Sequence, residues 1–386
     1  PSSWTCRSFR SWRRKVSSPA YTVANDAAGN PREVSACIYG TLNQMPWPIF
    51  LLAVSLFTFL GGAARAQDKK LEPLAVSYAS VTGSRTPLWV AREMGLFEKY
   101  ALDIKLINIS SGSTSMQALL GGDIQLVAAS GTSAVATAAQ GAPVVIVASS
   151  GPIAYKLIAH PSITSVQGLK GKIIGSSRAG AGTDFALRQL LPKLGLTPGK
   201  DITILPTGLS ESDRRLMLIM QGRIDATIGL ADNVLQLELR GQKLSVLADV
   251  LESGVWTSGS DIITTRAFLK SQRRRIKAFL MAFSEAIWLA KTRRELAYNT
   301  FRKYMKIENP RILEATYQTY VLGTIPDKPY PREESIQSDI DFLSAANPEF
   351  KKKKPSDFID TTLLREMESE GFFNRFPAAL EGSPRK

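Results

Sequence analysis

An alternation of short apolar segments and amphipathic segments runs twice along this sequence, and the second round repeats the first at an interval of 100 residues. Gly95 and Gly195 each stand in the same kind of apolar-Gly-Leu triplet, and Gly122 and Gly222 each follow a helical segment and precede an apolar one. Chance is the competing explanation, because any series of strands and helices resembles itself. The equal interval at two places favours two lobes of similar construction.

The alternation itself predicts the fold class. Strands are predicted at residues 74–79, 103–109, 124–129, 144–148, 172–175, 202–205, 226–229 and 262–265. Helices are predicted at 87–97, 113–120, 132–140, 183–194 and 214–220, and then at 275–291, 293–304, 311–322, 332–345 and 356–370. Strands that alternate with helices at this spacing indicate parallel sheets covered on both faces. We therefore predict an α/β protein of two lobes, each a mainly parallel sheet flanked by helices, with a helical C-terminal region.

Composition excludes several classes of function. The 386 residues include one His and two Cys, which is too few for most zinc, iron–sulfur or haem sites. A Ser-His-Asp or Cys-His mechanism would have to use His160, which precedes Pro161 in a predicted linker. The net charge of the whole chain is +14, and its basic excess could favour acidic ligands or simply confer solubility. No motif of basic and aromatic residues indicates nucleic-acid binding.

The N-terminal part is expected to lie outside the fold. Residues 1–44 lack an apolar period and are expected to be disordered or a mis-assigned translation. Residues 47–60 are apolar, but 14 residues are too few to span ~30 Å of hydrocarbon comfortably. Because small residues of the A-x-A form follow at 64–66, residues 45–66 are predicted to be a cleavable signal peptide, with an uncleaved membrane anchor as the alternative.

Loops rich in glycine and hydroxyl groups follow the predicted strands. In an open parallel sheet, ligands bind beyond the carboxyl ends of the strands, where helices begin. Glycine lets the backbone approach a ligand, and helix N-termini favour anions. The predicted ligand-binding residues are Thr82, Gly83, Ser84, Arg85, Ser111, Gly112, Ser113, Thr114, Ser130, Gly131, Thr132, Arg178, Gly180, Gly182, Thr183 and Asp232. Ordinary turn chemistry is the alternative for any single loop, so the prediction rests on the whole set.

Among these residues, Arg85 and Arg178 could clamp a carboxylate or sulfonate. Neither a Walker lysine nor a complete dinucleotide fingerprint is present, because Phe185 stands where the third glycine would be. Nothing pairs Asp184 or Asp232 as an acid/base dyad. We therefore predict no catalytic residues, no metal site and no cofactor.

Five motifs, in order along residues 74–283, carry a resemblance to a known family. They are TPLWVAREMGLFEKYALDIK at 86–105, ALLGGDI at 118–124 with GAPV at 141–144, SVQGLKGK at 165–172, LGLTP at 194–198 and MQGRIDA at 220–226. The set resembles substrate-binding proteins of the nitrate/sulfonate/taurine class of ABC importers, within the thiamine-pyrimidine-synthase-like superfamily. The resemblance implies a type II periplasmic binding fold, with one lobe at 72–152 and 255–386, the other at 153–254, and the ligand between them.

The function that this resemblance implies is that of a receptor rather than an enzyme. It would be a monomer in the periplasm that captures a small, anionic organic ligand by closing two lobes on it. The expected ligand is a sulfonate, a nitrate-like anion, a pyrimidine or an aromatic carboxylate. The expected partners are this ligand, an ABC permease and its ATPase, with membrane contact only through the permease. Synthases of the superfamily use a histidine and a cysteine-rich motif. After residue 66 this chain has no Cys and His160 is its one histidine, so that activity is not expected. An enzyme of the same fold and a membrane-anchored sensory binding protein are the alternatives.

Overall fold

The computed structural model describes residues 70–256 and 258–376. The unit described below comprises residues 69–386. The segments 1–44 and 45–66, predicted to be outside the fold and a signal peptide, lie outside the described residues. Within the described part, no helix combines the length and the apolar character needed to cross a membrane.

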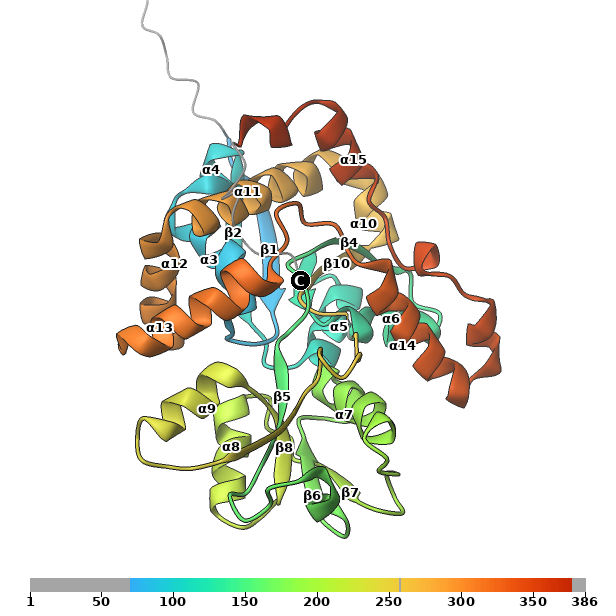
Figure 1. Ribbon diagram of the computed structural model, residues 1–386. Coiled ribbons are helices and arrows are strands. Elements are labelled where there is room, and N and C mark those ends of the chain that lie inside the picture. Colours follow the sequence, from blue (N-terminus) through green and yellow to red (C-terminus); the bar gives the residue numbers. More distant parts are fainter. Residues whose placement is uncertain (1–69, 257, 377–386) are drawn as a thin grey trace, which may run out of the picture. The chain divides into compact units, whose positions relative to one another are not determined.

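Two five-stranded sheets form the framework of this unit (Figure 1). The first has the order β2-β1-β3-β10-β4 and the second the order β7-β6-β8-β5-β9. Their strands are β1 (Glu72–Tyr78), β2 (Leu102–Asn108), β3 (Leu126–Ala129), β4 (Val144–Ser149), β5 (Tyr155–Ala159), β6 (Ile173–Ser176), β7 (Thr203–Pro206), β8 (Ala226–Leu230), β9 (Ser245–Asp249) and β10 (Asp261–Thr265). We call the first sheet with its helices the first lobe, and the second sheet with its helices the second lobe.

Each sheet contains one strand that runs against its neighbours. β1 pairs in parallel with β2 and β3, and β6 pairs in parallel with β7 and β8. β10 is antiparallel to β3 and β4, and β5 is antiparallel to β8 and β9. The chain therefore passes between the sheets twice, after β4 and after β9. The mainly parallel, two-lobe architecture predicted from the sequence is confirmed.

The 100-residue repeat has a structural cause. The two sheets have the same order if β1 to β4 are equated with β6 to β9 and β10 with β5. Gly95 and Gly195 have φ of 63° and 75°, and Gly122 and Gly222 have φ of 85° and 67°. Because residues other than glycine rarely adopt this left-handed region, the same turns require glycine in both lobes.

Helices cover both faces of each sheet. The first lobe contains α3 (Thr86–Glu93), α4 (Leu96–Lys99), α5 (Gly112–Gly121) and α6 (Gly131–Ala139), and the second contains α7 (Gly182–Lys193), α8 (Ser212–Met220) and α9 (Ala231–Glu238). The C-terminal region adds α10 (Arg266–Ser271), α11 (Arg273–Thr292), α12 (Arg294–Thr300), α13 (Pro310–Thr316), α14 (Glu333–Ala346) and α15 (Thr362–Ser369). Short 3-10 turns are η1 (Gly83–Arg85), η2 (Val166–Leu169), η5 (Pro348–Lys352), η6 (Pro355–Asp357) and η7 (Phe373–Arg375). Two π-helical segments, η3 (Phe301–Met305) and η4 (Tyr317–Thr324), continue α12 and α13.

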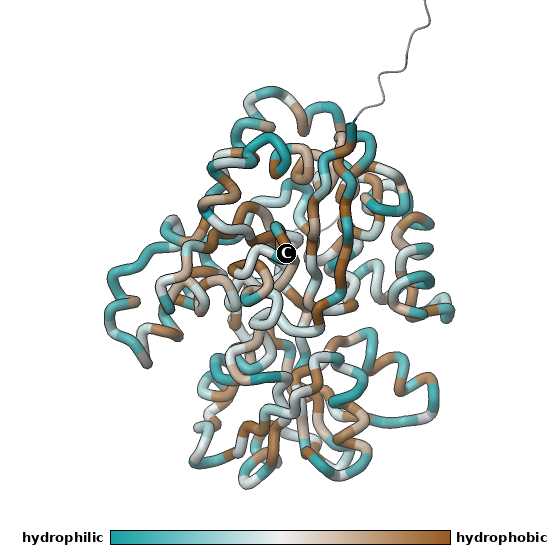
Figure 2. Tube along the Cα trace, turned by 180° about the vertical axis from the view of Figure 1, so that it is seen from behind, coloured by the Kyte–Doolittle hydropathy of each residue, from teal (hydrophilic) through white to brown (hydrophobic). Residues whose placement is uncertain are grey.

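The apolar cores follow this arrangement. In the first lobe, α11 contributes Phe279 and Phe283 to a cluster with strand residues such as Val76, while Ile340 of α14 belongs to a second cluster with Val127. The second lobe has two clusters as well, one containing Leu190 of α7 and one containing residues of α8 and α9. Figure 2 shows these apolar stretches along the strands of the chain.

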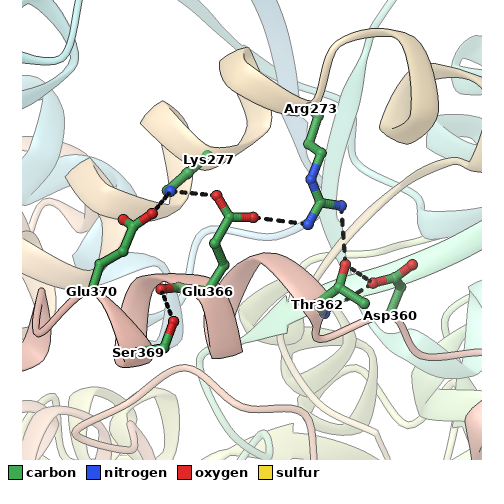
Figure 3. A network of polar contacts seen from close by, with 7 residues as sticks. All are labelled: Arg273, Lys277, Asp360, Thr362, Glu366, Ser369 and Glu370. Atoms are coloured by element: carbon green, nitrogen blue, oxygen red, sulfur yellow. Dashed lines mark hydrogen bonds and ion pairs between the residues drawn. The ribbon is translucent and has the colours of Figure 1, made fainter.

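Charged contacts attach α15 to α11 (Figure 3). Lys277 donates to Glu366 at 2.5 Å and to Glu370 at 2.7 Å, and Arg273 donates to Glu366 at 2.9 Å and to Thr362 at 3.2 Å. These contacts join α15 to α11, which packs against the first sheet.

Three sequence predictions need correction. The segment before His160, interpreted as a linker, is strand β5, and it pairs with both β8 and β9. Strand β9 and helix α9 were not predicted at all. The helix predicted at 356–370 begins only at Thr362 because residues before it extend the first sheet, where Ile359 bridges to Ile146 of β4.

Candidate functional site

A cavity of about 250 Å³ lies between the two lobes. The loops that follow β1, β2 and β7, the end of β8 and the start of α7, α8 and α9 form most of its wall. Its lining residues are Ala79, Ser80, Val81, Thr82, Asn108, Ser110, Tyr155, Thr183, Ser210, Glu211, Ser212, Asp213, Arg215, Leu230, Asn233, Gln236 and Met305. Because both lobes supply hydroxyl and amide groups, a small molecule in this cavity would contact both at once.

Of the predicted site residues, Thr82 and Thr183 line the cavity, one from each lobe. Thr82 follows β1, and its hydroxyl lies 2.6 Å from that of Ser84. Thr183 lies in the first turn of α7, where its hydroxyl accepts from the backbone N–H of Ser177 at 3.0 Å. Both side chains are held in place by contacts within their own loops.

Arg85 is buried behind this wall, with 1% of its surface exposed. Its guanidinium donates to the hydroxyls of Ser260 and Ser80, and Ser80 itself lines the cavity. Burial lowers the pKa of Arg85 to about 10, while Tyr155 and Asp261 act in the opposite direction. The side chain therefore remains cationic at neutral pH, one hydroxyl away from the cavity, and no carboxylate within the described residues forms an ion pair with it.

Several other predicted residues pack against each other instead of lining the cavity. Ser111 caps α5 by accepting from the N–H of Thr114, and its hydroxyl also lies 2.9 Å from that of Ser113. A Cβ on Gly112 would lie 2.6 Å from the hydroxyl of Ser133. These contacts hold the start of α5 against α6, so they shape the loop after β2 without reaching the cavity.

The loop after β3 belongs to a buried polar network in the first lobe. The hydroxyl of Thr132 donates to the carboxylate of Asp339 at 3.1 Å, and that of Ser258 donates to the same carboxylate at 2.5 Å. Ser130 donates to the backbone carbonyl of Ser258 at 2.7 Å. At Gly131 a Cβ would lie 2.0 Å from an oxygen of Asp261, so only glycine fits there. This network joins α6, α14 and the segment that leads into β10.

Three buried carboxyls have raised pKa values: Asp339 and Asp261 beside this network, and Asp232 on α9 of the second lobe. Burial raises the pKa of Asp339 and of Asp261 to about 7, and that of Asp232 to about 6. The charge of Asp261 adds to the effect on Asp339, whereas hydroxyl donors oppose it. Such groups titrate near neutral pH, so the network is sensitive to pH.

The loop after β6 contributes less than predicted. Arg178 is exposed and is not among the residues that line the cavity. Gly180 has φ of 71°, and its N–H donates to Asp184 at 3.1 Å, which makes it a turn residue. Gly182 begins α7 beside the first lobe, where a Cβ would lie 3.1 Å from Cβ of Ser130. The close approach of the two lobes requires a small residue at this position.

Arg215 is a cavity residue that the sequence reasoning missed. It is 1% exposed, and its guanidinium donates to the carbonyls of Leu209 and Ser210 at 2.8 Å and of Ile228 at 2.9 Å. Burial lowers its pKa. The signal was available, because Arg215 stands four residues before the buried Ile219 and so shares the apolar face of α8.

The lobes also touch outside the cavity. The ring centroids of Phe185 and Phe342 lie 5.0 Å apart, and the hydroxyl of Ser338 donates to the amide oxygen of Gln189 at 2.7 Å. The hydroxyl of Tyr320 donates to Asp232 at 3.4 Å. Asp232, predicted to bind ligand, thus contacts the first lobe, and only its neighbour Asn233 lines the cavity.

No cluster of three or more His, Cys, Asp or Glu side chains suited to a metal ion occurs among residues 70–256 and 258–376. His160 lies directly after β5, where its Nδ1 is 2.8 Å from the hydroxyl of Ser162. It is not among the residues that line the cavity. The polar groups that do line it are hydroxyls, amides, two carboxylates and one arginine.

Comparisons with known proteins agree with this architecture. Residues 83–295 match the model of a family described as NMT1/THI5 like. No curated protein matches the chain.

Solved structures show the same fold at low identity. The periplasmic aliphatic sulphonate binding protein SsuA from Escherichia coli is 22% identical with a TM-score of 0.59, covering 76% of this chain and 99% of its own. The periplasmic nitrate-binding protein NrtA from Synechocystis PCC 6803 is 15% identical with a TM-score of 0.61, covering 80% and 92%. The ligand-binding component of an ABC-type import system from Staphylococcus aureus, with zinc bound, is 13% identical with a TM-score of 0.63, covering 76% and 98%. The predicted fold and the predicted family resemblance are confirmed.

Proposed function

Because this chain belongs to the NMT1/THI5-like family, we propose that it is the solute-binding receptor of an ABC importer. In this proposal it captures a small, anionic organic ligand in the cavity between its lobes and delivers it to a membrane permease driven by a separate ATPase. It acts as a monomer in the periplasm after removal of residues 45–66, and it catalyses no reaction.

The observation that carries the proposal is that the wall of one cavity comes from the strand ends of both lobes. A ligand that contacts Thr82 on one side and Thr183 or Asn233 on the other binds the closed state more tightly than the open state. It therefore shifts an existing equilibrium toward closure. The lobe boundaries at 152/153 and 254/255 fit the two chain passages between the sheets and are part of the proposal.

The electrostatics of the first lobe favour an anion. Arg85 is cationic, no carboxylate of residues 70–256 and 258–376 lies within ion-pair distance of it, and the hydroxyl of Ser80 connects it to the cavity. A volume of about 250 Å³ suits a compact molecule. Sulfonates, nitrate-like anions, pyrimidines and aromatic carboxylates are the ligand classes to be tested.

A thermal-shift screen of these classes tests the proposal. At a concentration of ~100 times Kd, a ligand stabilises the folded state by about 2.7 kcal/mol, which raises the melting temperature by several degrees. Asn108→Leu and Asn233→Leu, one from each lobe, should both abolish the shift, whereas Asn374→Leu, outside the cavity, should preserve it. Absence of any shift in a well-folded sample would contradict the proposal.

A further inference from the structure

The C-terminal helices of the first lobe reach across to the second lobe on two sides, and both contacts involve residues beyond the family-matched segment 83–295. One contact joins α14 to α7, and the other joins η4 to α9. None of the six side chains that make these contacts lines the cavity. They can therefore stabilise closure without touching a ligand.

The contact between α14 and α7, which we call the α14 latch, consists of Phe342 with Phe185 and Ser338 with Gln189. The tilted rings, 5.0 Å apart, give the spacing at which aromatic pairs attract each other. The hydroxyl of Ser338 donates to the amide oxygen of Gln189 at 2.7 Å. Phe185 and Gln189 both lie on α7, the helix that also supplies Thr183 to the cavity.

The α14 latch is firmly anchored in the first lobe. Asp339, next to Ser338, accepts hydrogen bonds from Thr132 of α6 and from Ser258 of the second passage between the sheets. Ile336 and Ile340 of the same helix are 1% exposed and pack in the core of the first lobe. α14 therefore cannot follow α7 when the lobes separate, and opening must break the latch.

The contact between η4 and α9, which we call the η4 latch, consists of Tyr320 with Asp232 and a small apolar cluster. The hydroxyl of Tyr320 donates to Asp232 at 3.4 Å. The Tyr320 ring packs with Ile153 and Ala154 in the first passage between the sheets and with Leu230 at the end of β8, which also lines the cavity. Gly83 faces the same ring, where a Cβ would lie 2.3 Å from Cδ2, so the ring is fixed on the first lobe.

We propose that the α14 latch and the η4 latch stabilise the closed state relative to the open state, so that residues without ligand contact contribute to the affinity of the receptor. This inference rests on the proposed function, of which it describes the regulation. Apparent affinity scales with the fraction of molecules in the binding-competent state, so weakening a latch lowers affinity without changing any ligand contact.

Distance measurement between spin labels in ligand-free protein tests the latches. The labels are attached through Lys105→Cys on β2 and Lys200→Cys on the second lobe, two exposed positions. The full chain also carries Cys6→Ser and Cys37→Ser, so that no other thiol is labelled. The parent protein should show a long distance for the open state and a short distance for the closed state, and the ratio of the two is the quantity measured. Phe342→Ala should increase the open-to-closed ratio about tenfold, because ~1.4 kcal/mol, less than a fully buried phenylalanine contributes, corresponds to that factor. Phe268→Ala, a half-buried phenylalanine that packs only within the first lobe, should leave the ratio unchanged.

Tyr320→Phe tests the η4 latch with less risk to folding, because it removes one hydroxyl and keeps the ring. Its control is Tyr317→Phe, since the hydroxyl of Tyr317 donates to the carbonyl of Lys291 within the first lobe. Ser338→Ala serves in the same way for the α14 latch if Phe342→Ala does not fold. An open-to-closed ratio that stays unchanged in Ser338→Ala and Tyr320→Phe, or a parent protein without any closed population, would overturn the inference. Because no ligand is present, this result is independent of the thermal-shift screen that tests the proposed function.

Discussion

Asp339→Asn should flatten the pH dependence of the stability of the protein. The carboxyl of Asp339 is fully buried, and burial together with the charge of Asp261 raises its pKa from 3.8 to about 7, against the opposing effect of Ser258 and Thr132. The folded state therefore binds this proton more tightly than the unfolded state. The resulting stabilisation is complete below the unfolded pKa and is lost as the pH rises through the folded value.

The size of the effect follows from the same shift. Between pH 5 and pH 8 one such group removes ~3 kcal/mol in total from the free energy of unfolding, at about 1.4 kcal/mol per pH unit until the pH approaches the folded pKa. Asparagine has no proton to lose, and its amide oxygen can still accept from Thr132 and Ser258. Asp261 has the same raised pKa and remains, so the variant should keep part of the slope.

Urea unfolding at pH 5, 6, 7 and 8 provides the assay. The parent protein should lose stability over this interval, and Asp339→Asn should lose ~3 kcal/mol less. The control is Asp341→Asn, two residues along the same helix, where an exposed carboxylate accepts from Gln337 at 2.8 Å. Equal slopes in Asp339→Asn and the parent would refute the reasoning that this carboxyl is held in a water-poor network.

Two further substitutions probe the packing that shapes the site. Gly83→Ala should lower the free energy of unfolding by ~2 kcal/mol, and with it the melting temperature, because the added Cβ displaces the ring of Tyr320. The control is Gly121→Ala, whose Cβ would meet only a carboxylate oxygen of Asp123 at 3.7 Å, and it should be neutral or stabilising. Arg215→Met should lower the free energy of unfolding, measured with denaturant, by ~3 kcal/mol because buried carbonyls lose their hydrogen-bond donor. Arg214→Met, at an exposed position, should change it very little. Equal losses in the two variants would show that the buried hydrogen bonds are unimportant.

The sequence was sufficient for those parts of the fold that depend on local pattern. Apolar runs and glycine-terminated helices predicted eight of the strands and the repeat of 100 residues, because turn geometry at positions such as Gly122 and Gly222 is a local property. β5 and β9 were missed although both contain apolar residues, and pairing with strands distant in the sequence places them in the second sheet. The helix predicted to begin at residue 356 begins at Thr362, because Ile359 forms a bridge to β4, a contact with a distant part of the chain.

The candidate site was predictable to a smaller degree. The rule that ligands bind beyond strand ends located the loops of Thr82 and Thr183, which line the cavity. It could not distinguish cavity residues from those that hold loops together, as Gly112 and Thr132 do. Met305, more than 200 residues from Thr82, reaches the cavity only through the packing of the C-terminal helices.

A crystal structure with the compound that gives the largest thermal shift would test the central claim most directly. The account predicts that the compound lies in the cavity of about 250 Å³ and contacts the loop of Thr82 on one lobe and Thr183 or Asn233 on the other. A compound bound to one lobe alone, or on an outer surface while the cavity stays closed to it, would contradict the account.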